Sequence, residues 1–161
     1  MTMSKDPVAK AQTMIRAPVA KVFEAFVDPA VTTKFWFSKA SGPLVAGETV
    51  QWDWEMYGHA DHIHVRAIEA DKTIIYDWGG QGNLSRVEMT FTALDDGQTF
   101  VEVTNGGFHG DAKSVVAQAL DSNGGFTTVL CAAKVWLEHG INARLIEDKF
   151  PQALAAGWTG R

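Results

Sequence analysis

The sequence predicts an α+β domain in which a curved antiparallel sheet is covered by a long C-terminal helix. From Gly47 to Thr104, apolar residues alternate with polar ones in short runs separated by turn residues. This pattern is typical of antiparallel strands with one buried face. From Phe126 to His139 the apolar spacing becomes helical. An apolar sheet face must be covered, and this is the only predicted helix long enough to cover it.

A strand and two short helices are predicted to precede the alternating region. The strand spans residues 8–16, and Pro18 suits the first turn of the helix that follows. Asp28-Pro29 ends that helix, because the residue before a proline disfavours helical backbone. A second short helix is expected over residues 30–36.

The alternating region is predicted to form a meander of five strands, so the sheet has about six strands in all. Gly58, Asp71-Lys72 and Asp95-Asp96-Gly97 provide turns. The expected strands are residues 47–57, 59–70, 73–78, 85–94 and 99–104.

The C-terminal region is predicted to contain two helices separated by a break. Asp111 can cap a short helix that ends at Leu120, and Asn123-Gly124-Gly125 is expected to interrupt the chain. The long helix then runs from Phe126 to His139, where Gly140 can cap it, and is followed by one or two further helical turns over 141–150. We expect one domain over 1–161, with loose termini at 1–7 and 152–161.

Composition excludes several classes of partner. The 161 residues carry a net charge of −5 and no Lys/Arg cluster, so a nucleic-acid partner is not expected. No signal peptide or membrane-spanning apolar run is visible. The lone cysteine, Cys131, cannot form an intramolecular disulfide, which suits the cytoplasm, and it is predicted to be a small buried residue. A homodimer is left open.

The histidines allow two interpretations. His59, His62 and His64 lie near Asp53 and Glu55 in sequence, and zinc takes such ligands. However, a hairpin folding over 57–60 would pair Trp54 with Ile63 and Trp52 with Val65 on the inner face. Glu55 and His62, and Asp53 and His64, would then pair on the outer, solvated face. We therefore predict no metal and no cofactor.

The aromatic residues indicate a pocket. Each ring alone could belong to a packed core, but together the rings fit the wall of an apolar cavity better, because so many rings in one half of the sheet leave gaps that smaller residues would fill. Asn105 would be a polar group at the cavity end. The candidate ligand-binding residues are Trp36, Trp52, Trp54, Trp78, Met89, Asn105, Phe108 and Phe126.

Catalysis has little support from motifs. No nucleophile triad, phosphate loop or nucleotide fingerprint is present. Asp77 and Glu102 alternate with inward residues, so both are expected to face water. An enzyme would need a histidine or carboxylate aimed inward, and catalytic residues stay unassigned.

An ordered set of segments between Ala11 and Pro151 carries a family resemblance. The segments are Ile15-Arg16-Ala17-Pro18, Val22-Phe23, Phe35-Trp36-Phe37, Gly47-Glu48, Tyr76-Asp77-Trp78, 101–108 and 136–140. With these segments the chain resembles the helix-grip superfamily of START-like and pollen-allergen-like (SRPBCC) proteins. Within it, the chain is most similar to the activator of heat-shock-protein-90 ATPase homologue family.

The resemblance implies a helix-grip fold with an internal cavity between sheet and helix. The first hypothesis is therefore a binding module for a small hydrophobic ligand. The alternatives are an enzyme of cyclase, dehydratase or hydrolase type using the same cavity, and a chaperone ATPase co-factor, linked to stress response, that acts through its surface.

Overall fold

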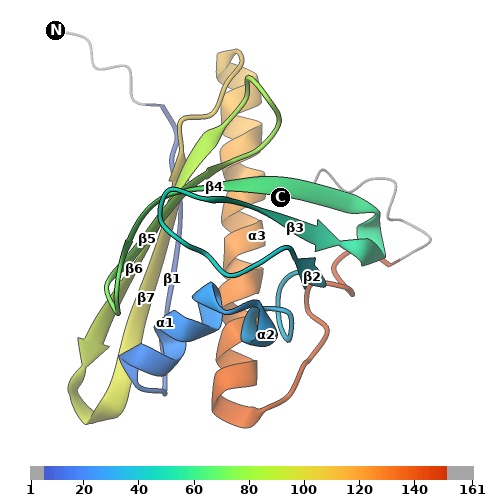
Figure 1. Ribbon diagram of the computed structural model, residues 1–161. Coiled ribbons are helices and arrows are strands. Elements are labelled where there is room, and N and C mark those ends of the chain that lie inside the picture. Colours follow the sequence, from blue (N-terminus) through green and yellow to red (C-terminus); the bar gives the residue numbers. More distant parts are fainter. Residues whose placement is uncertain (1–5, 152–161) are drawn as a thin grey trace, which may run out of the picture.

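The protein is described by a computed structural model that covers residues 6–151 and contains a seven-stranded antiparallel sheet and a long helix, α3 (Figure 1). Residues 1–5 and 152–161, which include most of the predicted loose termini, lie outside the described part. Strand order in the sheet is β1-β7-β6-β5-β4-β3-β2. The α+β class and the five-strand meander are confirmed.

The strands follow one another in the predicted order, with one strand, β2, added. β2 is a two-residue strand that pairs with Trp52 and Asp53, and so short a run has no detectable period. The elements are β1 Ala9–Ile15, α1 Val19–Val27, α2 Pro29–Thr32, β2 Lys39–Ala40, β3 Thr49–Trp54, β4 His59–Glu69, β5 Thr73–Trp78, β6 Ser85–Leu94, β7 Gln98–Gly106 and α3 Ala112–His139, with short 3-10 turns η1 Glu55–Tyr57 and η2 Asp95–Gly97.

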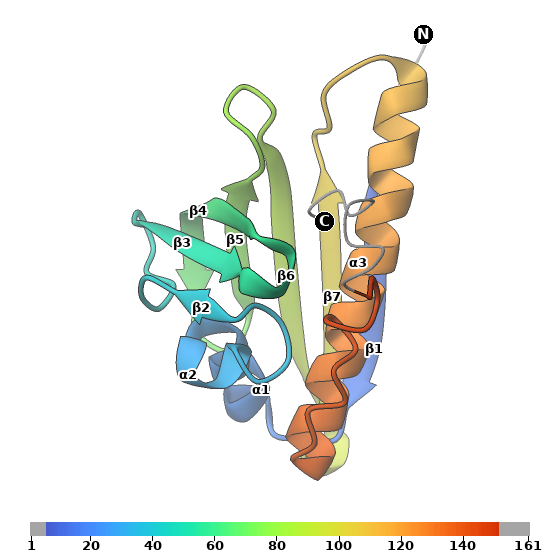
Figure 2. The same cartoon turned by 90° about the vertical axis from the view of Figure 1, so that its right-hand side faces the viewer.

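The helix α3 crosses only one part of the sheet. It packs against β1 and β7, while β2 to β5 curve away on the other side (Figure 2). Its apolar stripe includes Phe126, Leu130, Ala133 and Leu137, all buried. The inner face of β3, β4 and β5 is therefore covered largely by side chains and not by the helix backbone.

The predicted break at Asn123-Gly124-Gly125 is wrong, because α3 runs without interruption for 28 residues. Glycine disfavours a helix interior by about 1 kcal/mol, an amount that tertiary contacts readily exceed. Here the Asn123 side chain accepts a hydrogen bond from the Lys10 N–H at 3.0 Å, which ties this turn to β1. The predicted caps at the two ends are confirmed: Asp111 accepts from the Ser114 N–H, and Gly140 ends the helix with φ 67°.

The predicted hairpin register is also wrong. Trp54 pairs with His59, and Trp52 with Asp61, so the strands are offset by four residues from the expected pairing. The reason is the connection: β3 ends in the 3-10 turn η1, and Gly58 at φ 61° ends that turn just before the return strand β4 begins at His59. Glu55 consequently belongs to the turn, and Asp53 faces Ala60 instead of His64.

The segment after α3 contains turns and no helix, in contrast to the prediction for 141–150. It crosses from the end of α3 to the β3–β4 hairpin. There the Tyr57 hydroxyl donates to the Ile146 carbonyl, and the Phe150 N–H donates to the Tyr57 oxygen at 3.3 Å. Within the segment, the Asp148 N–H donates to the Arg144 carbonyl at 2.9 Å, which forms an isolated turn.

Candidate ligand-binding site

An aromatic layer coats the inner face of the sheet from β3 to β5. We define this layer by six buried rings, each less than 6% exposed. Trp52 and Trp54 come from successive inward positions of β3, and Trp78 from β5, because side chains alternate along a strand. The full layer is Trp36, Phe37, Trp52, Trp54, Trp78 and Phe126.

The rings of the aromatic layer contact one another directly. Trp36 lies 4.9 Å from Trp52 and 5.9 Å from Phe126, measured between ring centroids. Trp78 lies 5.6 Å from Phe126, so the layer reaches α3. These separations are those of edge-to-face and tilted aromatic pairs. Five of the eight predicted binding residues are thus brought together: Trp36, Trp52, Trp54, Trp78 and Phe126.

A second group of side chains, which we call the inner polar cluster, adjoins the aromatic layer and shares Trp78 with it. It consists of His59, Asp61, Tyr76 and Trp78. His59 and Asp61 share the parity of Ile63 and Val65, which are buried in the core, so all four point to the inner face of β4. Tyr76 occupies the equivalent inward position on β5 and is fully buried. Two titratable groups of β4 are therefore held among tryptophans.

Three polar atoms of the inner polar cluster are buried and make no hydrogen bond with any described residue. They are Asp61 Oδ2, the Tyr76 hydroxyl and Trp78 Nε1. The Asp61 Oδ2 atom lies 3.9 Å from His59 Nε2, which is beyond hydrogen-bonding distance. The other oxygen of this carboxylate accepts the His62 N–H at 3.1 Å, which fixes its orientation. Native proteins rarely leave such atoms unpaired.

The cluster is electrostatically coupled. Burial, and after it the charge of Asp61, raise the pKa of Tyr76 well above its usual value of 10.0. The Tyr76 hydroxyl thus keeps its proton at neutral pH and is able to donate a hydrogen bond. Trp78 Nε1 can only donate, and the Asp61 carboxylate can only accept. The arrangement offers both donors and an acceptor within an apolar wall.

The remaining three predicted binding residues are not part of the aromatic layer. Met89 is buried on β6 between Ile74 and Val103, and Phe108 is half-buried in the loop before α3. Asn105 is fully buried on β7, but its hydrogen bonds are made within the protein. Its amide donates to Ser85 Oγ at 3.0 Å and to the Arg86 carbonyl at 2.9 Å, and its oxygen accepts from Ser122 Oγ at 2.8 Å. Asn105 therefore links the sheet to α3.

The outer face of the sheet differs from the prediction at Asp77. Its carboxylate is largely buried, because Arg66 and Arg86 close over it with Nε atoms at 2.7 and 2.9 Å. The hydrogen bond from Arg86 is the main influence on the pKa of Asp77; burial opposes it, Arg66 adds to it, and the net direction is downward. Glu102 lies half-buried and pairs with Lys10 at 3.2 Å.

The histidines are divided between the two faces. His62 and His64 pair with Gln51 and Thr49 on the outer face, whereas His59 points inward. Within residues 6–151, no three His, Cys, Asp or Glu side chains gather as metal ligands.

Cys131 is exposed, which contradicts the prediction that it is buried. Its position on α3 lies next to the apolar stripe in sequence but on the solvent side of the helix. An apolar neighbourhood in sequence does not decide which face a helical residue occupies.

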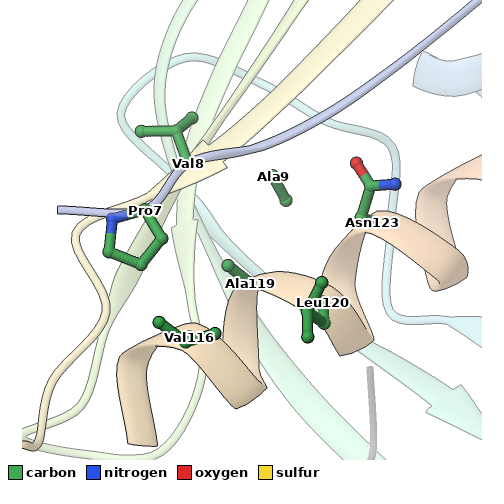
Figure 3. A pocket seen from close by; sticks show the side chains of 7 residues that line it. All are labelled: Pro7, Val8, Ala9, Val116, Ala119, Leu120 and Asn123. Carbon is green, nitrogen blue, oxygen red and sulfur yellow. The ribbon is translucent and has the colours of Figure 1, made fainter. Parts of the chain in front are cut away.

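A separate apolar pocket lies on the surface between the start of β1 and the first half of α3 (Figure 3). Its volume is about 190 Å³. Val8, Val116 and Leu120 at its rim are 58%, 47% and 70% exposed. The other lining residues are Pro7, Ala9, Ala119 and Asn123.

Sequence reasoning missed His59, Asp61 and Tyr76 as functional candidates. The signal was available for β4, because Ile63 and Val65 were already placed inward and His59 and Asp61 have the same parity. The inward position of His59 and Asp61 was missed because the histidines were assigned to the outer face as one group. Tyr76 lies two residues before Trp78 and therefore shares its inward face, but the sequence analysis does not identify its hydroxyl as a polar group in an apolar wall.

A curved antiparallel sheet, two short helices after the first strand and a long C-terminal helix together define a helix-grip protein. The comparison with protein families is more specific. Residues 16–132 match the family described as Activator of Hsp90 ATPase homolog 1-like protein, and the chain belongs to this family. The resemblance stated from the sequence is thereby confirmed. No curated protein matches the sequence significantly.

Solved structures agree with this assignment. A protein from Staphylococcus saprophyticus is 31% identical, with a TM-score of 0.74 over 85% of this chain and 96% of that chain. DynU16, a protein of the dynemicin biosynthetic locus, is 26% identical with a TM-score of 0.73; the match covers 86% of this chain but only 49% of DynU16. The Aha1 protein from Colwellia psychrerythraea, solved as a dimer, is 20% identical with a TM-score of 0.70 over 83% of this chain and 97% of that chain, and shows the shared fold.

None of the helices in the described residues is both long and apolar enough to span a membrane.

Proposed function

We propose that the protein binds a small, largely apolar ligand between the β3–β5 half of the sheet and α3. The binding residues would be those of the aromatic layer, with the inner polar cluster at its side. Met89 and Phe108 would extend the same apolar wall. The family and the fold are consistent with ligand binding, because the resemblance to helix-grip proteins implies a cavity between the sheet and the long helix.

The observation that carries the proposal is the set of three unpaired buried polar atoms. Leaving a buried polar atom unpaired costs about 1–3 kcal/mol. A core built only for stability would hold apolar groups at these positions, because an apolar replacement removes that cost. A few placed polar groups in an aromatic wall are instead the usual plan of a small-molecule site.

The proposal is tested with an apolar aromatic probe, 2-methylnaphthalene. A probe that binds only the folded protein raises its stability by about 2.7 kcal/mol at a hundredfold excess over Kd, so the melting temperature should rise saturably. Trp78→Ala should weaken binding and cost less than the roughly 3–5 kcal/mol of a ring removed from a solid core. Leu120→Ser, in the surface pocket of Figure 3, is the control and should leave the affinity unchanged.

Two results would contradict the proposal. One is an unchanged melting temperature with every probe concentration, together with the full core penalty for Trp78→Ala. The other is loss of binding in Leu120→Ser alone, which would move the site to the surface pocket. Native mass spectrometry of freshly purified protein would complement this test by detecting a ligand that co-purifies.

An enzyme using the same site is the second candidate, and one observation favours it. His59 and Asp61 place an imidazole and a carboxylate on the inner face, 3.9 Å apart, and a pair of this kind is able to accept and return a proton. The reaction would be of the cyclase, dehydratase or hydrolase type. His59→Gln should then abolish turnover of a bound substrate while leaving its affinity within about twofold, whereas a pure binding protein shows no turnover to lose.

A chaperone ATPase co-factor acting through its surface is the third candidate. Its support is the family name together with the exposed apolar rim formed by Val8, Val116 and Leu120. Leu120→Ser should then reduce stimulation of a chaperone's ATPase, and Trp78→Ala should not.

A further inference from the structure

The inner polar cluster also indicates which polar group the ligand contains. We infer that the ligand has a hydroxyl group on an apolar body, and that Asp61, Tyr76 and Trp78 bind this hydroxyl. This inference rests on the proposed function, because it assigns a ligand class to the same site.

The three unpaired atoms lie on neighbouring strands of one face. His64 pairs with Asp77, so Trp78, the next residue of β5, reaches the level of Ile63, two residues from Asp61 on β4. Tyr76 and Trp78 have ring centroids 5.6 Å apart, and Tyr76 lies 5.6 Å from Trp52, the residue that pairs with Asp61. Asp61 is also near enough to act on Tyr76 electrostatically. The three atoms therefore belong to one region of the inner face, where we infer that one ligand group meets them.

The hydrogen-bonding roles of these atoms select the group. Asp61 Oδ2 needs a donor, Trp78 Nε1 needs an acceptor, and the Tyr76 hydroxyl provides a further donor. A hydroxyl both donates and accepts through a single atom. A ketone or ether leaves Asp61 unpaired, and an ammonium group leaves Trp78 unpaired. A carboxylate would meet the charge of Asp61 in apolar surroundings, which is unfavourable.

The surroundings select the rest of the ligand. Trp52, Trp54 and Trp78 are each at most 3% exposed and offer aromatic faces and edges. An apolar body, and an aromatic one best, would contact these rings.

The experiment compares 2-naphthol with 2-methylnaphthalene by calorimetric titration of the full chain. The two probes differ only by a hydroxyl in place of a methyl group of similar size. We expect 2-naphthol to bind about tenfold more tightly, as a gain of one to two buried hydrogen bonds implies. Tyr76→Phe and Asp61→Leu should each bring the ratio of the two affinities closer to one. The affinity for 2-naphthol should fall, and the affinity for 2-methylnaphthalene should stay unchanged or rise.

Two controls keep the test decisive. Asp53→Leu removes a carboxylate from the neighbouring strand β3 on the outer face, and should preserve the tenfold preference. The melting temperature of Tyr76→Phe without probe should equal or exceed that of the natural chain, because this variant removes an unpaired polar atom and no hydrogen bond with a described residue. A residue with a merely structural role would lower it.

The outcomes separate the two proposals. Equal affinity of the natural chain for the two probes, or a preference that survives both Tyr76→Phe and Asp61→Leu, overturns the hydroxyl inference alone. Failure of both probes to bind overturns the proposed function and this inference with it.

Discussion

The two halves of the inner surface treat buried polar groups in opposite ways. Where β7 meets α3, Asn105 makes three hydrogen bonds with Ser85, Arg86 and Ser122. In the β3–β5 half, Asp61 Oδ2, the Tyr76 hydroxyl and Trp78 Nε1 are equally buried and make none with the described residues. Both regions belong to one continuous sheet, so the difference does not reflect a change of architecture.

The edge strand β1 extends the first pattern. Its free side is capped by α3: Asn123 accepts from the Lys10 N–H, Lys134 donates to the Met14 carbonyl at 2.7 Å, and Glu138 accepts from the Arg16 N–H at 2.8 Å. Covering an edge in this way protects it from pairing with another chain. The comparison shows that the β1–β7–α3 half uses its polar groups to hold the fold, whereas the β3–β5 half leaves them available.

The largest effect is expected from Asn105→Leu, which breaks the polar link in the first half. It removes three hydrogen bonds and leaves Ser122 Oγ and the Arg86 carbonyl without their partner. We expect a loss of about 3 kcal/mol in the free energy of unfolding, measured by urea denaturation. A loss below about 0.5 kcal/mol, which is the usual range for a surface substitution, would show that the fold does not depend on Asn105.

The next effect concerns the outer-face ion pair and its dependence on pH. The pKa of Asp77 is lowered in the folded state, so its contribution to stability is fully present above the ordinary carboxyl value of 3.8 and is lost as pH falls through the folded value. Asp77→Asn should cost about 1 kcal/mol at pH 7, and the difference from the natural chain should vanish in acid. A difference that stays constant from pH 7 to strongly acidic pH would argue against the ion pair as its source.

A smaller effect is expected at the edge strand. Asn123→Ala removes one exposed hydrogen bond to β1 but favours the helix, so the free energy of unfolding should change by less than about 1 kcal/mol. Amide hydrogen exchange at Lys10 should nevertheless become faster. Unchanged exchange at this amide would show that Asn123 does not protect the edge.

The smallest effect on stability is expected at Cys131. Because this thiol is exposed, it should react with a thiol reagent in the folded protein nearly as fast as in urea, and Cys131→Ala should leave the melting temperature unchanged. Labelling that requires denaturant would place the thiol on the buried face of α3.

The sequence predicted the elements of this fold well because alternation, turn residues and caps are local. Asp28-Pro29, Asp111 and Gly140 act at helix ends as expected. Asn123-Gly124-Gly125 does not end a helix, since contacts with β1 outweigh local propensity. The hairpin register failed because a 3-10 turn, invisible in the alternation, displaces the pairing by four residues.

The candidate site was predicted in its apolar part and missed in its polar part. Tryptophans on alternate strand positions identify an apolar face directly. The polar character depended on recognising His59 and Asp61 as inward, and on knowing that Tyr76 and Asn105, both polar and both buried, differ in whether their hydrogen bonds are made. That difference depends on residues distant in sequence, such as Ser122, and only the three-dimensional structure reveals it.

The central claim is that the polar groups of the β3–β5 half do not hold the fold. Two deletions of a single buried hydroxyl test it most directly: Ser122→Ala, where the hydroxyl donates to Asn105 at 2.8 Å, and Tyr76→Phe, where it has no partner among residues 6–151. Urea denaturation at pH 7 should show a loss of about 1–3 kcal/mol for Ser122→Ala and no loss, or a gain, for Tyr76→Phe. Equal losses for the two variants would contradict the account.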